Sequence, residues 1–193
     1  MNSALHLLRI NVSLLLFFTA LFGVGYPLFS TLILQTLFPH QASGSLVRDN
    51  KGDVVGSELI GQPFTQPHYF WGRPSVTAPY PYNASASQAS NLNPSNPKFS
   101  EAVKERVAVL KNADPQQTTP IPVDLVTASA SGLDPHISLA AAVYQVSRVA
   151  KARNLTESQV HEIVKRFTTS HDFFLGEPRV NVLLTNLALD GRL

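Results

Sequence analysis

The sequence contains no cysteine, and charged residues occupy only 15% of its 193 positions. The lack of cysteine excludes disulfide bonds, thiolate metal sites and a cysteine nucleophile. The low charge is unusual, because about a quarter of the residues in a soluble domain are charged. The shortage is local: no Lys, Arg, Asp or Glu occurs from Ile10 to Val47. The chain therefore divides into an uncharged apolar segment and a charged remainder long enough for one domain.

The apolar segment predicts a retained transmembrane helix over residues 10–38, preceded by a short tail of residues 1–9. About 20 apolar residues cross a bilayer core. A signal peptide has a shorter apolar stretch and an A-x-A cleavage site, which this segment lacks. Pro27 removes a backbone donor, so the helix should loosen there. Three small residues would let another helix approach closely: Ala20, Gly23 and Gly25.

The distribution of basic residues around this helix predicts its orientation. Arg9 precedes the helix, and no Lys or Arg follows it until Arg48. Positive charge usually stays on the cytoplasmic side. We therefore expect a single-pass protein with a cytoplasmic N-terminus and an extracytoplasmic domain over residues 39–193.

The pattern of residues 39–193 predicts one α+β domain with a small sheet and about three helices. Residues 45–61 have strand formers around a turn and predict a hairpin. Short strands are also expected at 122–126 and 179–189. Apolar residues at helical spacing predict the three helices, which run through Phe99–Leu110, Leu139–Ala150 and Val160–Phe167.

Candidate catalytic and metal-binding residues lack the spacing that such sites need. Ser129, Asp134 and His136 could be assembled into a triad, but no G-x-S-x-G motif is present. No histidine pair has ligand spacing, so we predict no metal site and no catalytic residue. The six histidines are His6, His40, His68, His136, His161 and His171.

Residues 139–167 read as helix, short turn and helix, which resembles the outline of a DNA-binding helix-turn-helix. The alternative function is therefore a membrane-anchored DNA-binding regulator. A net charge of +2 is small for such a protein, and the expected orientation places the domain away from DNA, so we expect no nucleic-acid partner. The basic residues of this segment are Arg148, Lys151, Arg153, Lys165 and Arg166.

The stretch VTASASGLDPHIS, residues 126–138, could bind a phosphate or simply begin a helix. A phosphate-binding P-loop needs two glycines and a lysine at fixed spacing. This stretch has one glycine, Gly132, and no Lys or Arg lies between Lys111 and Arg148. We predict a helix-start turn made by Gly132, Asp134 and Ser138, with Asp134 as the carboxylate at the start of the helix.

Six blocks together resemble the C subunit of the Kdp-type potassium-transporting ATPase, the KdpC family. They cover nearly the whole chain from the apolar segment onward. The blocks are GYPLFSTLILQTLFPHQASGSL (25–46), GSELIGQPFTQPHYFWGRPS (56–75), YNASASQASNLNPSNP (82–97), PVDLVTASASGLDPHIS (122–138), YQVSRVAKARNL (144–155) and EPRVNVLLTNLALD (177–190).

The resemblance implies an accessory subunit of an ATP-driven, high-affinity potassium uptake complex in a bacterial plasma (inner) membrane. Its implied partners are a channel-like A subunit, a P-type ATPase B subunit and a small F subunit. Potassium would be the transported ion rather than a ligand of this chain, and no tightly bound cofactor is expected. The family role is that of a catalytic chaperone that raises the ATP affinity of the B subunit, and Gln145 is associated with that nucleotide role.

Two sequence observations qualify these expectations. An extracytoplasmic domain meets no ATP, and Gln145 lies beside an apolar helical stripe, so a hydrogen bond at the edge of the core is the alternative role. Gln88 and Ala89 stand where the family usually has two glycines, and a turn that needs glycine there is not expected. Leu139 and Ser147 replace prolines that are common in the family.

Overall fold

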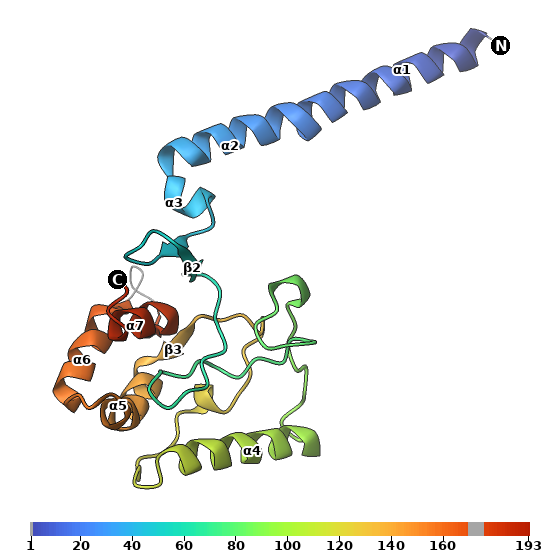
Figure 1. The fold of residues 1–193 in the computed structure, drawn as a ribbon. Coiled ribbons are helices and arrows are strands. Elements are labelled where there is room, and N and C mark those ends of the chain that lie inside the picture. The colour runs from blue at the N-terminus through green and yellow to red at the C-terminus, as the bar shows by residue number, and fades with distance from the viewer. Residues whose placement is uncertain (1, 170–175) are drawn as a thin grey trace. The chain divides into compact units, whose positions relative to one another are not determined.

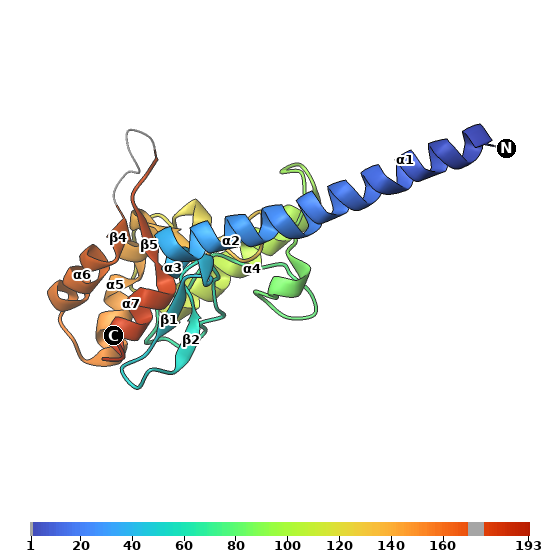
Figure 2. The ribbon, with the colours of Figure 1, turned by 90° about the horizontal axis from the view of Figure 1, so that it is seen from above.

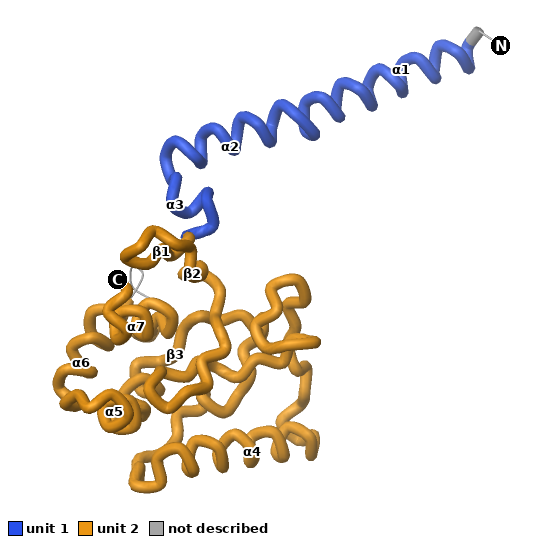
Figure 3. The backbone as a smooth tube through the Cα atoms, in the orientation of Figure 1, with its two compact units in different colours: residues 1–45 blue, residues 46–193 orange. Residues whose placement is uncertain are grey.

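The computed structural model describes residues 2–169 and 176–193. The chain forms two compact units, Met1–Ser45 and Leu46–Leu193, which Figure 3 colours separately. The predicted limits of the tail and the membrane helix, at residues 9 and 38, stay predictions. His171 lies outside the described residues.

The first unit is helical (Figure 1). The segment Ser3–Leu37 has a mean hydropathy of 2.0 in its most apolar window, and none of that window is buried. It is long and apolar enough to cross a membrane. The helical elements are α1 (Asn2–Phe18), a π-helical stretch (Thr19–Gly25), α2 (Tyr26–Leu37) and α3 (Pro39–Ala42).

The π-helical stretch lies directly before Pro27, where we expected the helix to loosen. The N–H of Tyr26 donates to the carbonyl of Leu21, five residues back. A proline ring in a regular α-helix clashes with the carbonyl four residues earlier, here that of Gly23. The wider π turn gives that ring room, and the helix continues without a break in the chain direction.

The second unit contains two small antiparallel sheets. The predicted hairpin forms one of them, and Asp49 organises its turn by accepting hydrogen bonds from the N–H groups of Lys51 and Asp53. The hairpin strands are β1 (Leu46–Arg48) and β2 (Val54–Ser57). The second sheet has the order β3-β5-β4, made by β3 (His136–Ser138), β5 (Arg179–Asn181) and β4 (Thr168–Thr169).

The predicted helices are present, and residues that favour helix ends mark their limits. Asn96 accepts a hydrogen bond from the N–H of Lys98, Thr156 and Gln159 form a capping box, and Asn154 ends a helix in the left-handed conformation. The α+β class with one apolar N-terminal helix is confirmed. The helices are α4 (Pro97–Ala113), α5 (Leu139–Arg153), α6 (Glu157–Arg166) and α7 (Val182–Leu189), with 3₁₀ turns at Ala84–Ala86 and Val123–Leu125.

Two strand predictions were wrong. Residues 122–126 contain a 3₁₀ turn instead of a strand. In residues 179–189 only the first three form a strand, and the rest form α7. The side chain of Asn181 accepts a hydrogen bond from the N–H of Leu184 and so begins this helix. A short apolar run that is buried all round shows neither strand nor helix periodicity, which is why the sequence pattern was ambiguous.

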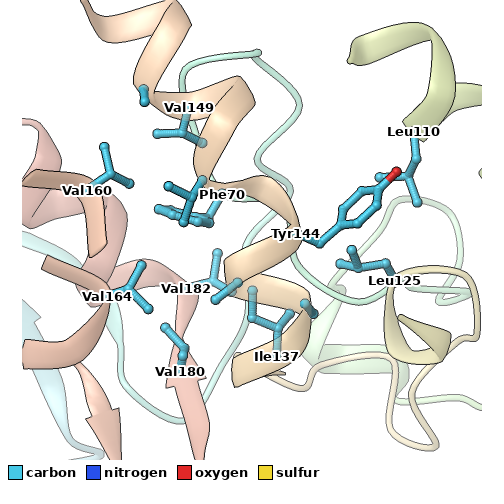
Figure 4. Packing of buried hydrophobic residues seen from close by; sticks show 14 of the residues in the cluster. Phe70, Leu110, Leu125, Ile137, Tyr144, Val149, Val160, Val164, Val180 and Val182 are labelled. Carbon is cyan, nitrogen blue, oxygen red and sulfur yellow. The ribbon is translucent and has the colours of Figure 1, made fainter. Parts of the chain in front are cut away.

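The main core lies between α5, α6 and the three-stranded sheet, and Figure 4 shows its apolar side chains. Figure 2 shows β4 and β5 beside α5, α6 and α7. Phe70, which belongs to the long connection between β2 and α4, is 1% exposed within this core. That connection is therefore ordered. A second cluster of Val47, Leu183 and Leu187 joins the hairpin to α7.

Candidate functional site

Two buried amide side chains, Gln145 of α5 and Asn186 of α7, hold the backbone of Phe70 and Trp71. The N–H of Phe70 donates to Asn186 Oδ1 at 2.8 Å, and Asn186 Nδ2 donates to the carbonyl of Phe70 at 3.0 Å. The N–H of Trp71 donates to Gln145 Oε1 at 2.8 Å, and Gln145 Nε2 donates to the carbonyl of Trp71 at 3.1 Å. Each amide thus satisfies both backbone polar groups of one residue, as a neighbouring β-strand would. We call Gln145 and Asn186 the amide clamp.

The side chain of Gln145 has no hydrogen-bonding capacity left. Besides its two bonds to Trp71, Oε1 accepts from Arg148 Nη2 at 2.6 Å and Nε2 donates to the carbonyl of Ala141 at 3.2 Å. A glutamine amide offers two N–H donors and one oxygen with two lone pairs. The residue is only 1% exposed. A ligand could therefore bind this amide only by breaking a bond inside the domain.

Arg148 supports the same loop from the adjacent turn of α5. Its guanidinium donates to the carbonyls of Tyr69, at 3.0 Å, and Pro67, and it lies 4.1 Å from the centroid of the Trp71 ring. Burial lowers the pKa of Arg148 to about 10, so the side chain is still charged at neutral pH. A buried cation is tolerated here because carbonyl oxygens and an aromatic face surround it.

Arg153, one further turn along α5, also bonds internally. Its Nε donates to the carbonyl of His68 at 2.6 Å, and its Nη2 lies 2.7 Å from Asp190 Oδ1. Lys151 is 3.4 Å from the buried carboxylate of Asp114. These basic side chains are directed to groups of the domain itself, which removes much of the basic face that a helix-turn-helix would present to phosphates. The DNA-binding alternative gains no support from the fold.

The stretch 126–138 folds as a turn that leads into α5, as predicted. The carboxylate at the start of the helix is not the predicted one, however. Ser138 is the N-cap, and its hydroxyl accepts from the N–H of Ala141 at 3.0 Å. The carboxylate at this helix start belongs to Asp124, whose Oδ2 accepts from the N–H of Ser138 at 2.7 Å. Asp134 instead pairs with Arg73 at 3.1 Å and accepts from the N–H of His136 at 3.0 Å. Asp134 lies four residues before the cap, and the extended strand β3 separates the two positions.

Gly132 makes the turn possible, because its φ is +68° and its Cα faces other chain segments closely. The two residues that replace the usual glycines, Gln88 and Ala89, have no positive φ. The N–H of Gln88 donates to the carbonyl of Ser131 at 3.0 Å, so this segment packs against the turn without glycine.

Asp134→Ala should lower stability by about 1 kcal/mol at neutral pH, because it removes an ion pair at a partly exposed position. Burial opposes ionisation of Asp134, but hydrogen bonds from His136 and Arg73 outweigh it and lower its pKa. A lowered pKa stabilises the fold above the unfolded value of 3.8, and that stabilisation disappears as pH falls below it. Thermal melts at pH 7 and pH 3 check this.

The melting-temperature difference between wild type and Asp134→Ala should be largest at pH 7 and should shrink towards pH 3. Asp53→Ala is the control, since Asp53 is exposed and belongs to the hairpin turn. An equal difference at both pH values would contradict an electrostatic contribution of Asp134.

Of the three triad candidates, the structure brings Asp134 and His136 together, with His136 Nδ1 3.7 Å from Asp134 Oδ1, but it does not bring Ser129 to them. Among the described residues, the hydroxyl of Ser129 makes no hydrogen bond to His136, and its N–H donates to the carbonyl of Pro74. No group of three or more His, Asp or Glu side chains that could hold a metal ion occurs in residues 2–169 and 176–193.

An open groove of about 360 Å³ lies beside the clamped loop. Phe64, Trp71 and Pro74 of the loop line it on one side, and Val109 and Leu110 of α4 line it on the other. The amide clamp therefore fixes one wall of this groove. The sequence pattern did not indicate this groove, because the loop has no periodicity that would show which side chains face α4.

Comparisons with known proteins give a consistent result. The family profile described as "KdpC: K+-transporting ATPase, c chain" matches residues 8–191. A curated protein of Methylococcus capsulatus, named potassium-transporting ATPase KdpC subunit, is 61% identical over 92% of this chain and 93% of its own length. Proteins of the same name from Sorangium cellulosum and Methylibium petroleiphilum are 60% and 59% identical, over 95% and 96% of this chain and 97% of each relative.

Proposed function

Because the chain belongs to the KdpC family, the C chains of K⁺-transporting ATPases, we propose that it is an accessory subunit of a Kdp-type potassium-transporting ATPase. The observation that carries this proposal is 61% identity to a named KdpC subunit over nearly the full length of both proteins. The single candidate span among the described residues supports attachment to the membrane through the N-terminal helix.

The proposed partners are the potassium-conducting A subunit, the ATP-hydrolysing B subunit and the F subunit of the complex. The face of the membrane helix around Ala20, Gly23 and Gly25 would pack against one of them. All three residues are exposed, and a Cβ added at Gly23 would first meet Thr19 Cγ2, at 3.8 Å. Small residues on an exposed apolar helix allow close approach of a second helix, which supports this assignment.

We place the domain on the outer face of the bacterial plasma membrane and give it no catalytic step of its own. Arg9 before the span and the long uncharged stretch after it support this orientation. ATP would then act on the complex through the B subunit. The saturated hydrogen bonding of Gln145 favours a structural role for this residue over direct contact with nucleotide.

Affinity purification of the chain and a reporter fused after Leu193 test this proposal together. Membrane extracts should yield the other pump subunits and potassium-stimulated ATPase activity with the tagged chain. A reporter that works only after export should be active, and the same reporter fused after Asn2 should be inactive. Activity of a cytoplasm-only reporter at Leu193 would refute the orientation, and purification without any pump subunit would refute the assignment.

A further inference from the structure

The hairpin of β1 and β2 is the first part of the second unit, and the uncharged run of the sequence ends inside it. No charged residue occurs from Ile10 to Val47, and Arg48, on β1, is the first one after the membrane span. Charged side chains mark where a spanning segment leaves the lipid, because they are costly in the hydrocarbon core. In this chain that mark lies on the hairpin itself and not on the linker before it.

The linker between the span and the hairpin is short. The last residue of α2 is Leu37, and Leu46 begins β1 nine residues later. Four of the linker residues form α3. A helical residue adds about 1.5 Å and an extended residue about 3.4 Å, so the linker reaches at most about 23 Å from the end of α2. A linker of this length and without charge keeps the start of the hairpin within reach of the lipid headgroups.

The pairing of the strands defines an outer hairpin face, made by Leu46, Arg48, Val54 and Ser57. Leu46 pairs with Ser57, Arg48 pairs with Val54, and paired residues of antiparallel strands point to the same side. Val47, between them, points inwards and is 5% exposed. A hairpin that covers a core usually has polar side chains on its outer face. Here Leu46 and Val54 are 41% and 50% exposed.

The outer hairpin face has a fixed direction, because the hairpin is attached to the domain on its other side. Val47 packs in the second apolar cluster, against α7. The N–H of Asn50 donates to the carbonyl of Arg192 at 3.1 Å, and Arg192 Nη2 lies 2.8 Å from Asp49 Oδ2. The exposed aliphatic side chains cannot turn inwards without breaking these contacts.

The basic side chains of the hairpin are available to phosphate groups. Among the described residues, neither Arg48 nor Lys51 has a carboxylate partner: Arg48 donates to a backbone carbonyl, and Lys51 is exposed. Asp49 is paired with Arg192, which leaves Asp53 as the opposing charge in the turn. Long basic side chains can lay their aliphatic stems along an apolar layer and keep their charge among headgroups.

We propose that the outer hairpin face lies against the phospholipid surface, on the side of the membrane where the domain is. Leu46 and Val54 contact the boundary between headgroups and acyl chains, and Arg48 lies among the phosphates. Contact with lipid removes the two aliphatic side chains from water, which is favourable. This inference goes beyond the proposed function and rests only on the membrane attachment within it.

The composition of the hairpin favours lipid over a protein partner. The buried centres of protein interfaces are enriched in aromatic residues and depleted of lysine. Residues 46–59 contain no aromatic residue and include Lys51. Exposed aliphatic side chains beside Lys and Arg, directly after a membrane span, are typical of a segment that lies in the membrane interface.

The lack of cysteine allows a spin label to be attached at a single introduced position. V54C and L46C report on the outer hairpin face, and V109C, on α4, is the matched control. Val54 and Val109 are 50% and 56% exposed, and Figure 1 shows the hairpin and α4 at opposite ends of the second unit. The labelled full chain, alone and in the purified complex, is placed in nanodiscs of phosphatidylethanolamine and phosphatidylglycerol.

Electron paramagnetic resonance then compares how often each label collides with O₂, which enters lipid, and with a polar nickel complex, which stays in water. The ratio of O₂ to nickel accessibility should be about threefold or more higher at V54C and L46C than at V109C, because a bilayer concentrates apolar solutes and excludes polar ones. The ratio should be high both for the chain alone and for the complex.

Two other results would overturn the inference. High nickel accessibility at V54C and L46C would mean that the outer hairpin face is in water. Low accessibility to both reagents would mean that protein covers it. Recovery of the chain in the soluble fraction would instead count against membrane attachment, and purification without pump subunits would count against the proposed assembly, whatever the labels report.

Discussion

Replacement of Gln145 by Ala is expected to lower the free energy of unfolding by about 3–5 kcal/mol, because it leaves several buried polar groups without partners. The groups are the N–H and carbonyl of Trp71 and one N–H of Arg148. The melting temperature should fall by about 6–20 °C for a chain of this size. Thermal melts of the purified chain measure this.

The same variant separates a structural role from a nucleotide role. In complexes assembled below its melting temperature, Gln145→Ala should leave the apparent ATP affinity of the pump within about twofold, since it removes no contact to nucleotide. A tenfold loss of apparent ATP affinity, in a variant that assembles and melts normally, corresponds to about 1.4 kcal/mol of lost coupling free energy between this residue and the nucleotide site. That result would show that the nucleotide role associated with the family reaches Gln145.

Two variants sharpen this comparison. Asn186→Ala removes the other half of the amide clamp, so a structural role predicts that it behaves like Gln145→Ala in both assays. Val143→Ala shortens a side chain that is 46% exposed on the same helix, and it should change neither stability nor ATP affinity appreciably. If Asn186→Ala melted normally, the clamp would contribute little to stability.

Gly132→Ala is expected to lower stability by about 2–4 kcal/mol, which combines an unfavourable backbone conformation with a steric clash. The φ of Gly132 is +68°, and an added Cβ would lie 2.6 Å from Thr77 Cγ2 and 2.9 Å from the carbonyl oxygen of Gln88. The Gln88 oxygen belongs to the backbone, so the segment around it must move. Denaturant unfolding of the purified chain measures the loss.

Gly52→Ala is the matched control. Gly52 has a φ of +87°, but a Cβ there would meet nothing within 4 Å. It should cost about 1 kcal/mol, which is the backbone contribution alone. Equal losses at Gly132 and Gly52 would mean that the turn at Gly132 moves freely and that the contact with residue 88 is not tightly packed.

The sequence by itself determined the features that depend on short-range chemistry. The uncharged run specified the apolar helix, and Pro27 indicated where its hydrogen bonding changes. Asn96 and Thr156 with Gln159 specified helix starts, because capping joins a side chain to a backbone group at most three residues away. Asn154 specified a helix end, because asparagine tolerates the left-handed conformation. The six blocks specified the family, which the profile match and the named relatives confirmed.

The tertiary structure alone decided which distant groups meet. Gln145 and Trp71 are 74 positions apart, and Asn186 and Phe70 are 116 apart. No local pattern shows that these amides replace a β-strand partner for an irregular loop. Likewise, Asp124 rather than Asp134 reaches the start of α5, because the chain turns back between them. A polar side chain forms its hydrogen bonds with whatever the fold places within 3 Å, and this placement is set by packing of the whole domain.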